Sequence, residues 1–160
     1  MSSTDCTFDA NGCLVCPAVA AAPARAAQVI TSPDLGWNAG ANSMAQLDGD
    51  VHVVFALAAL PVGVLVGLKH GRAFPTSPEL IENGLYLYTI GGQAFVEVRE
   101  RGAARGAAQA YALNATLEIK REAGRVTYLA AGVLLWASTV LSTGAVLVNA
   151  CLYSAGDTIP

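Results

Sequence analysis

The 160-residue sequence predicts an all-β protein: an antiparallel β-sandwich of about eight or nine strands, preceded by a short irregular N-terminal arm. Two observations predict this fold class. From Gly36 onward, turn signals recur at short intervals and separate runs of strand length, and in two of those runs charged residues alternate with apolar ones. We therefore divide the chain into an arm or anchor over residues 1–35 and a sandwich domain over residues 36–160.

The first 35 residues differ in composition from the rest. They hold three of the seven prolines and the low-complexity stretch AVAAAPARAA, which offers little β-branched or aromatic material for a core. Pro23 would interrupt any helix formed there, so we expect an arm or anchor laid on another surface. The opening MSSTDCTFDANG lacks a basic segment followed by an apolar one, which predicts a protein made without a secretion signal.

Three of the four cysteines crowd into the first sixteen residues: Cys6, Cys13 and Cys16. The CxxC spacing is that of half a zinc knuckle or of a redox pair, but a second CxxC or an HxxxH is missing and both histidines are distant. A metal site, a disulfide involving Cys6 and ordinary apolar packing all remain open. These cysteines are weak metal candidates, and we expect no bound metal or cofactor. Cys151, within LVNACLY, is expected in the core.

Eight runs of strand length are visible, at residues 51–58, 62–69, 85–90, 93–100, 116–121, 125–129, 133–138 and 146–153. Gly91-Gly92 predicts a two-residue type I′ hairpin, because both residues can adopt positive φ. Further turns are expected at Glu122-Ala123-Gly124 and Ala131-Gly132.

Charge alternation is clearest in residues 93–101, where Glu97, Arg99 and Arg101 oppose Val96 and Val98, and in residues 117–122, where Glu118, Lys120 and Glu122 oppose Leu117 and Ile119. A period of two is typical of a half-buried strand. We expect the charges to line a solvated sheet face, with cross-strand ion pairs of Glu97 or Arg99 with Lys120 or Glu118.

Two long runs without charge, residues 51–68 and 128–153, also suggest membrane helices. Pro61 interrupts the first run, and the serines and threonines of residues 138–143 read as a loop within the second. We expect strands and no membrane insertion, and keep a small membrane protein as an alternative.

The chain is 54% hydrophobic and only 13% charged, against a usual charged share of about 25%. Such a surface would leave apolar patches exposed in a monomer, which predicts a homo-oligomer. The net charge of -3 gives no electrostatic reason to expect nucleic acid as a partner.

Motifs across residues 36–157 resemble those of a concanavalin A-like, lectin or jelly-roll sandwich module. In that module a strand ending in Arg, a turn at Gly, a strand with Val-x-Tyr, a second Gly turn and a strand with Leu-Leu-x-x-Ser follow in order. The matching residues are Arg121, Gly124, Val126, Tyr128, Gly132, Leu134, Leu135 and Ser138.

Modules of this kind occur in bacterial surface proteins and in bacteriophage appendages such as tail fibres, baseplate proteins and head spikes. The resemblance implies a virion structural or adhesion component that binds a host surface polysaccharide, or that only attaches a fibre or collar to other virion proteins. A trimer is the oligomer that fibres suggest by analogy. The arm without a secretion signal is similar to the phage version of such a protein.

Glycan hydrolases of this superfamily place two carboxylates on one face of a strand, about 5 Å apart in retaining enzymes. Glu97 and Glu100 point to opposite faces of a strand, while Glu118 and Glu122 have Lys120 between them and a turn at the second. We therefore expect no enzymatic activity.

The longest irregular stretch inside the domain runs from Lys69 to Gly84, and binding residues concentrate on loops held by a rigid scaffold. The candidate ligand-binding residues there are His70, Arg72, Glu79, Glu82 and Asn83. Trp37, at the junction of arm and domain, is added because an aromatic face can cover a sugar ring.

Overall fold

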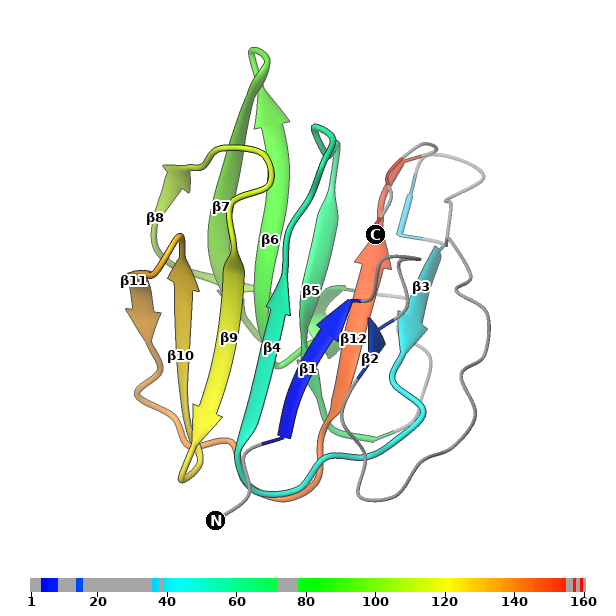
Figure 1. The fold of residues 1–160 in the computed structure, drawn as a ribbon, viewed down its shortest axis with the longest axis vertical. Helices are drawn as coiled ribbons and strands as arrows, with labels where there is room; N and C mark the ends of the chain where they lie inside the picture. The colour runs from blue at the N-terminus through cyan, green and yellow to red at the C-terminus, as the bar shows by residue number, and fades with distance from the viewer. Residues whose placement is uncertain are drawn as a thin grey trace.

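The computed structural model describes residues 4–8, 14–15, 36–37, 39–71, 78–154, 157 and 159, and these form a two-layered β-sandwich (Figure 1). This confirms the predicted fold class. The described part contains two six-stranded sheets and a single turn of 3-10 helix, η1 (Pro78–Leu80).

Sheet A contains, in spatial order, β11 (Val133–Ala137), β10 (Arg125–Ala130), β9 (Leu117–Glu122), β4 (Val51–Phe55), β1 (Thr4–Phe8) and β2 (Leu14–Val15). Its strands pair antiparallel except β1 and β4, which are parallel, with Thr4 opposite Val51. The sheet is therefore mixed at the point where the N-terminal segment joins it.

Sheet B contains β3 (Ala39–Asn42), β12 (Leu147–Leu152), β5 (Val64–Lys69), β6 (Asn83–Ile90), β7 (Gln93–Glu100) and β8 (Ala103–Ala110), all antiparallel. The edge strands β8 and β11 lie on the same side of the sandwich (Figure 1). Each of these two strands is the last of its sheet, so both sheets end on that side.

Four hairpins, β6–β7, β7–β8, β9–β10 and β10–β11, use two-residue turns whose second residue is glycine. Gly91-Gly92 has φ of 58° and 80°, as a type I′ turn requires, and the turn predicted there is confirmed. Arg101, Ala123 and Ala131 occupy the first position of the other three turns with φ of 51°, 47° and 48°. These three adopt a left-handed conformation that costs a non-glycine residue about 1–2 kcal/mol.

The core lies between the inner faces of the two sheets. Along β7 the buried residues alternate with half-buried ones, as predicted from its charge pattern. The largest fully buried apolar side chains include Leu57, Leu65, Leu68, Leu85, Leu87, Leu117, Ile119, Leu147 and Leu152. Cys151 is buried, as expected, and its thiol is free; burial raises the pKa of this thiol to about 12 despite the nearby Lys69.

Two expectations about strands need correction. Parts of the arm that we expected to be irregular, residues 4–8 and 14–15, form strands that extend sheet A. The sequence analysis also missed β8, because its sequence AARGAAQA contains no β-branched or aromatic residue. Its strand conformation comes from pairing with β7.

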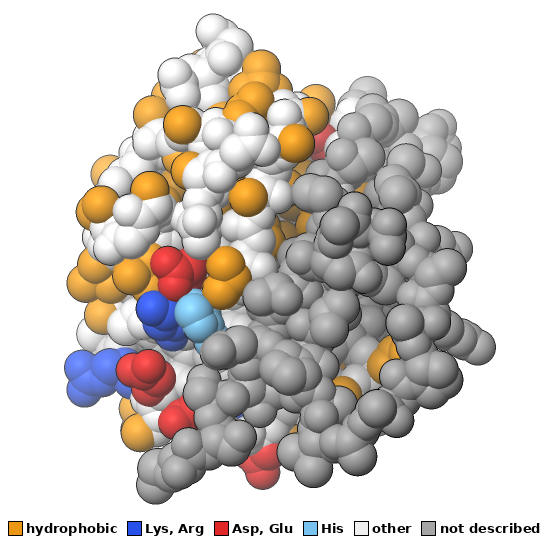
Figure 2. All heavy atoms as spheres, viewed as in Figure 1, with side chains coloured by type: hydrophobic (Ala, Val, Ile, Leu, Met, Phe, Trp, Pro, Cys, Tyr) orange, Lys and Arg blue, Asp and Glu red, His pale blue; other side chains and the backbone are white. Residues whose placement is uncertain are grey.

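The expected ion pairs between residues 97–99 and 118–120 are wrong, because β7 and β9 belong to different sheets. Glu97 pairs with Arg99 on its own strand. Glu118 contacts Lys120 at 3.1 Å on β9 and His52 at 2.8 Å on the neighbouring β4. Figure 2 shows the molecule from the same direction as Figure 1. Most of the charged side chains visible there gather in one area.

The two charge-free runs form strands and connections rather than helices: β4 and β5 lie in the first, and β11 and β12 in the second. Among the described residues, no helix is long and apolar enough to cross a bilayer.

Candidate functional site

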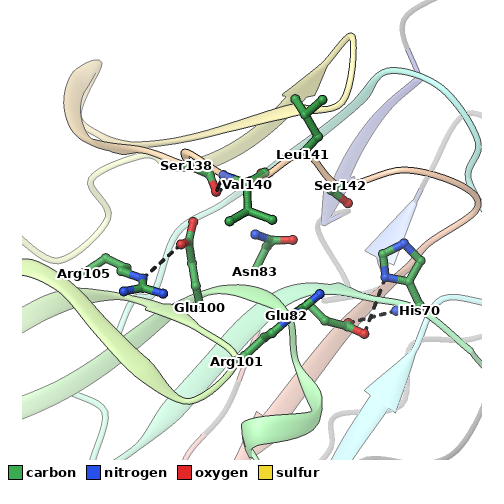
Figure 3. A pocket seen from close by; sticks show the side chains of 10 residues that line it. All are labelled: His70, Glu82, Asn83, Glu100, Arg101, Arg105, Ser138, Val140, Leu141 and Ser142. Carbon is green, nitrogen blue, oxygen red and sulfur yellow. Dashed lines mark hydrogen bonds and ion pairs between the residues drawn. The ribbon is translucent and has the colours of Figure 1, made fainter.

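A cleft with a cavity of about 130 Å³ lies at the end of the sandwich where β5 ends and β6 begins. Figure 3 shows segment 138–142 on one side of it, Glu82, Arg101 and His70 on the other, and Asn83 and Glu100 between them. Its lining comprises His70, Glu82, Asn83, Glu100, Arg101, Arg105, Ser138, Val140, Leu141 and Ser142.

A chain of buried hydrogen bonds forms the floor of the cleft. Asn83 Nδ2 donates to the hydroxyl of Tyr128 at 3.0 Å, and that hydroxyl donates to Glu100 Oε1 at 3.2 Å. Arg105 Nε donates to the other oxygen of Glu100 at 3.1 Å. Tyr128 comes from sheet A and the other three residues from the β6–β8 side of sheet B, so this network joins the two layers.

Burial raises the pKa of the Tyr128 hydroxyl far above its ordinary value of 10.0; the hydrogen bond from Asn83 opposes this shift and the carboxylate of Glu100 adds to it. The hydroxyl is therefore protonated at any physiological pH and acts as a donor to Glu100. In the floor of the cleft, Tyr128 is thus a fixed hydrogen-bond donor to Glu100 and acceptor from Asn83.

His70 connects two walls of the cleft. Its Nε2 lies 2.7 Å from the carbonyl oxygen of Thr143, which can only accept, so this nitrogen carries the proton and donates. Its Nδ1 lies 3.5 Å from Glu82 Oε1. Glu82 also accepts the backbone N–H of His70 at 2.9 Å, and its own carbonyl accepts from the N–H of Arg101 at 3.1 Å. Glu82 therefore holds His70, which follows β5, and Arg101, which lies in the turn between β7 and β8.

The opposite wall is the segment 138–142, whose side chains Val140 and Leu141 are 56% and 62% exposed. Backbone bonds from Ser138 to Val126 O and from Ser142 to Gly124 O hold the segment against β10. Behind it, the buried guanidinium of Arg121 donates to Gly144 O at 2.8 Å. The cleft thus combines a polar floor with an apolar lip, formed by Val140 and Leu141, which backbone hydrogen bonds hold in place.

Three of the predicted site residues meet in the cleft: His70, Glu82 and Asn83. Glu79 does not line it; its side chain lies instead against the turn at Gly102. Arg72 lies outside the described residues.

Trp37 is likewise absent from the cleft lining. It packs edge-on against Tyr153 at 5.4 Å and against Tyr86 at 5.9 Å, beside the small buried cluster of Leu65, Ile81 and Cys151. Tyr86 continues into a stack with Tyr88 at 5.0 Å. The Trp37 ring thus makes an edge-on and a tilted contact with two tyrosine rings, which are packing contacts.

Sequence reasoning missed the residues from β7, the β7–β8 turn, β8 and the 138–142 segment. One signal was available for Glu100: it shares the parity of the inward-facing Ala94, Val96 and Val98, and a charge on the apolar parity of a strand predicts a buried polar network. Segment 138–142 carries no such signal, because its approach to β6 and β7 depends on how the sheets stack.

The two carboxylate pairs considered for catalysis are placed as expected. Glu97 lies on the outer face of β7 beside Arg99, whereas Glu100 points into the sandwich toward Tyr128. The carboxylate of Glu118 is in contact with the side chains of Lys120 and His52. For metals, no group of three or more His, Cys, Asp or Glu side chains converges among the described residues; the side chains of Cys6, Cys13 and Cys16 are not among those described.

The similarity of the chain to known proteins is distant. No model of a known family matches the sequence, and no curated protein matches it. Among solved structures, the chain is similar to a β-glucanase from Bacillus licheniformis at 14% identity and a TM-score of 0.39, over 78% of this chain and 64% of that chain. The chain spans less than two thirds of the length of that protein.

Proposed function

We propose that this protein is a non-enzymatic adhesion component of a bacteriophage tail or other virion appendage, and that its cleft binds a saccharide of the host cell surface. The virion assignment rests on the sequence resemblance over residues 36–157. The binding assignment rests on one observation: a floor of hydrogen-bonded polar groups beneath the exposed apolar lip of Val140 and Leu141.

A saccharide suits such a cleft because a sugar ring presents hydroxyl groups at its edge and an apolar C–H surface on its face. The hydroxyls need both donors and acceptors, which the floor supplies as Asn83 amide, Glu100 carboxylate and Arg105 guanidinium groups. The C–H surface would lie against the lip. Because Glu100 is already engaged by Tyr128 and Arg105, a binding role for it is favoured over proton transfer.

A binding assay with host material tests this proposal. The wild-type protein should bind intact host cells and purified envelope polysaccharide, and Val140→Ser with Leu141→Ser should reduce that binding about tenfold by removing apolar contact area. The matched control is Leu60→Ser with Val62→Ser, two comparably exposed residues in the β4–β5 connection. No binding of the wild-type protein to any envelope fraction would reject the adhesion proposal.

A second candidate, a structural collar or fibre-attachment subunit without ligand binding, is favoured by the exposed edge of sheet A. The segment 133–141, VLLWASTVL, carries no charge, and Val133 and Leu134 are both well exposed. Figure 2 shows apolar side chains at the surface along the side where β8 and β11 lie. An uncharged apolar edge is typical of a subunit interface.

Sedimentation analysis tests this second candidate. Leu134→Glu should dissociate the expected homo-oligomer, while Leu80→Glu, at an exposed position on η1, should not. A wild-type protein that is monomeric at micromolar concentration would argue against the subunit role. Retention of the protein in assembled particles without any envelope binding would favour it over adhesion.

A further inference from the structure

The charged groups that line the cleft are matched with one exception. Glu100 is bonded by Arg105 and Tyr128, and Glu82 lies beside His70. The guanidinium of Arg101 has no hydrogen bond or ion pair with the part of the chain that the structure describes. The cleft therefore offers a ligand one guanidinium that no group in the described part of the chain engages.

The backbone of Arg101 is fixed although its side chain is unpaired. Its φ of 51° is left-handed, the following Gly102 has φ of 79°, and its N–H donates to Glu82 O at 3.1 Å. Ala123 and Ala131 adopt the same conformation in the corresponding turns, so it belongs to the hairpin geometry. The turn thus holds the base of this side chain at the mouth of the cleft.

A second unmatched group faces the same cavity. Ser142 is only 6% exposed, and its hydroxyl is buried without a partner among the described residues. The neighbouring backbone groups are already used: the N–H of Ser142 donates to Gly124 O, and Thr143 O accepts from His70. A buried hydroxyl without a partner is costly, and an oxygen atom of a ligand in the cavity would satisfy it.

We propose that the cleft selects an acidic saccharide, with the ligand's carboxylate paired to Arg101 and the Ser142 hydroxyl donating to a ligand oxygen. This inference rests on the saccharide-binding function proposed above and specifies the ligand class. A guanidinium is planar and matches a carboxylate with two parallel hydrogen bonds. A neutral sugar would leave that charge unmatched, and a cationic ligand would be repelled by it.

The nearby carboxylates do not oppose this assignment. Glu100 is paired with Arg105 at 3.1 Å, and its side chain is almost completely buried. Glu82 accepts the backbone N–H of His70 at 2.9 Å, and its other oxygen lies 3.5 Å from Nδ1 of that residue. Both carboxylates thus have contacts of their own, which leaves Arg101 available to the ligand.

Two probes that differ only at C6 test the ligand class: methyl β-glucuronide, which bears a carboxylate there, and methyl β-glucoside, which bears a hydroxymethyl group in its place. Amide NMR titration should show the glucuronide binding about tenfold more tightly, as expected for one charge-assisted pair. Arg101→Gln should abolish this preference, and Ser142→Ala should weaken binding of the glucuronide.

The matched control is Arg125→Gln, at an exposed arginine that lines an adjacent groove with Glu122 and Thr127 but does not line the cleft; it should leave the preference unchanged. Circular dichroism and thermal unfolding of each variant exclude misfolding as the cause of lost binding. Inorganic phosphate at equal ionic strength should not displace the glucuronide. If phosphate did displace it, the saccharide part of the proposal would be overturned.

The outcomes separate this inference from the function on which it depends. Equal binding of the two glycosides, unaffected by Arg101→Gln, would overturn the acidic ligand and leave the adhesion proposal standing if envelope polysaccharide is still bound. Failure to bind either glycoside together with failure to bind any envelope fraction would reject both.

Discussion

The hydroxyl of Tyr128 on β10 lies 3.2 Å from the carboxylate of Glu100 on β7, and so joins the two sheets through the interior of the sandwich. The same hydroxyl accepts a hydrogen bond from Asn83 at 3.0 Å. A single side chain from sheet A thereby fixes the two polar residues of sheet B that form the floor of the cleft. Fold stability and site geometry depend on the same contact.

Tyr128→Phe should lower the free energy of unfolding by about 1–3 kcal/mol, because it leaves a buried carboxylate oxygen and a buried amide without their partner. Urea denaturation followed by circular dichroism measures the change. We also expect weaker ligand binding, since Asn83 and Glu100 would no longer be held in place.

Tyr111→Phe is the matched control. Tyr111 is also buried, but its hydroxyl has no partner among the described residues, and burial raises its pKa to about 12. Removing this hydroxyl should leave stability unchanged or raise it. Equal losses in the two variants would show that the Tyr128 network contributes nothing beyond ring packing.

Arg121→Met should destabilise the protein by at least about 2 kcal/mol. Arg121 is 1% exposed, and its guanidinium donates to the carbonyl oxygens of Gly49, Gly144 and Leu47 at 2.8, 2.8 and 3.3 Å. These acceptors would lose charge-assisted hydrogen bonds. The control is Lys120→Met, on the solvated side of the same strand, which should lower the free energy of unfolding by less than about 1 kcal/mol. A similar loss of stability at both positions would contradict the anchoring role of Arg121.

Ala131→Asn should raise the melting temperature. Ala131 has φ of 48° at the first position of a two-residue turn, and asparagine adopts this conformation more readily than alanine. The expected gain is up to about 1 kcal/mol, measured by calorimetry. Ala104→Asn, at an exposed position of β8, should give no gain because asparagine is disfavoured in strands. A loss at position 131 would argue against strain in this turn.

Glu118 should make stability depend on pH. Burial tends to raise the pKa of its carboxyl, but hydrogen bonds from His52 and Lys120 outweigh that effect and lower it below 4.5. A lowered pKa in the folded state means that this stabilisation is present above the ordinary pKa and is lost as pH falls through the folded value. Glu118→Gln should therefore be destabilising at pH 7 and nearly neutral at pH 2. A loss that is independent of pH would contradict this ion pair.

The hairpins of the domain could be predicted from sequence because their signals are local. Gly91-Gly92, Gly124 and Gly132 each mark a turn, and charge alternation identifies the strands at residues 93–100 and 117–122. The strand β8 could not be found in this way, because its alanine-rich sequence folds only through pairing with β7.

The candidate site was predicted in part. His70, Glu82 and Asn83 lie close together in sequence, so a loop argument found them. Their partners, Tyr128 and Thr143, are brought to them by the stacking of two sheets, which no local pattern encodes. The parallel pairing of β1 with β4 is likewise a long-range contact.

The most direct test of saccharide binding at the cleft is an amide NMR titration of the protein with envelope polysaccharide purified from the host. The largest resonance changes should fall on His70, Glu82–Asn83, Glu100–Arg105 and Ser138–Ser142, which line the cleft. Changes confined to the aromatic face of Trp37, Tyr86 and Tyr88, or no changes at saturating polysaccharide, would contradict it.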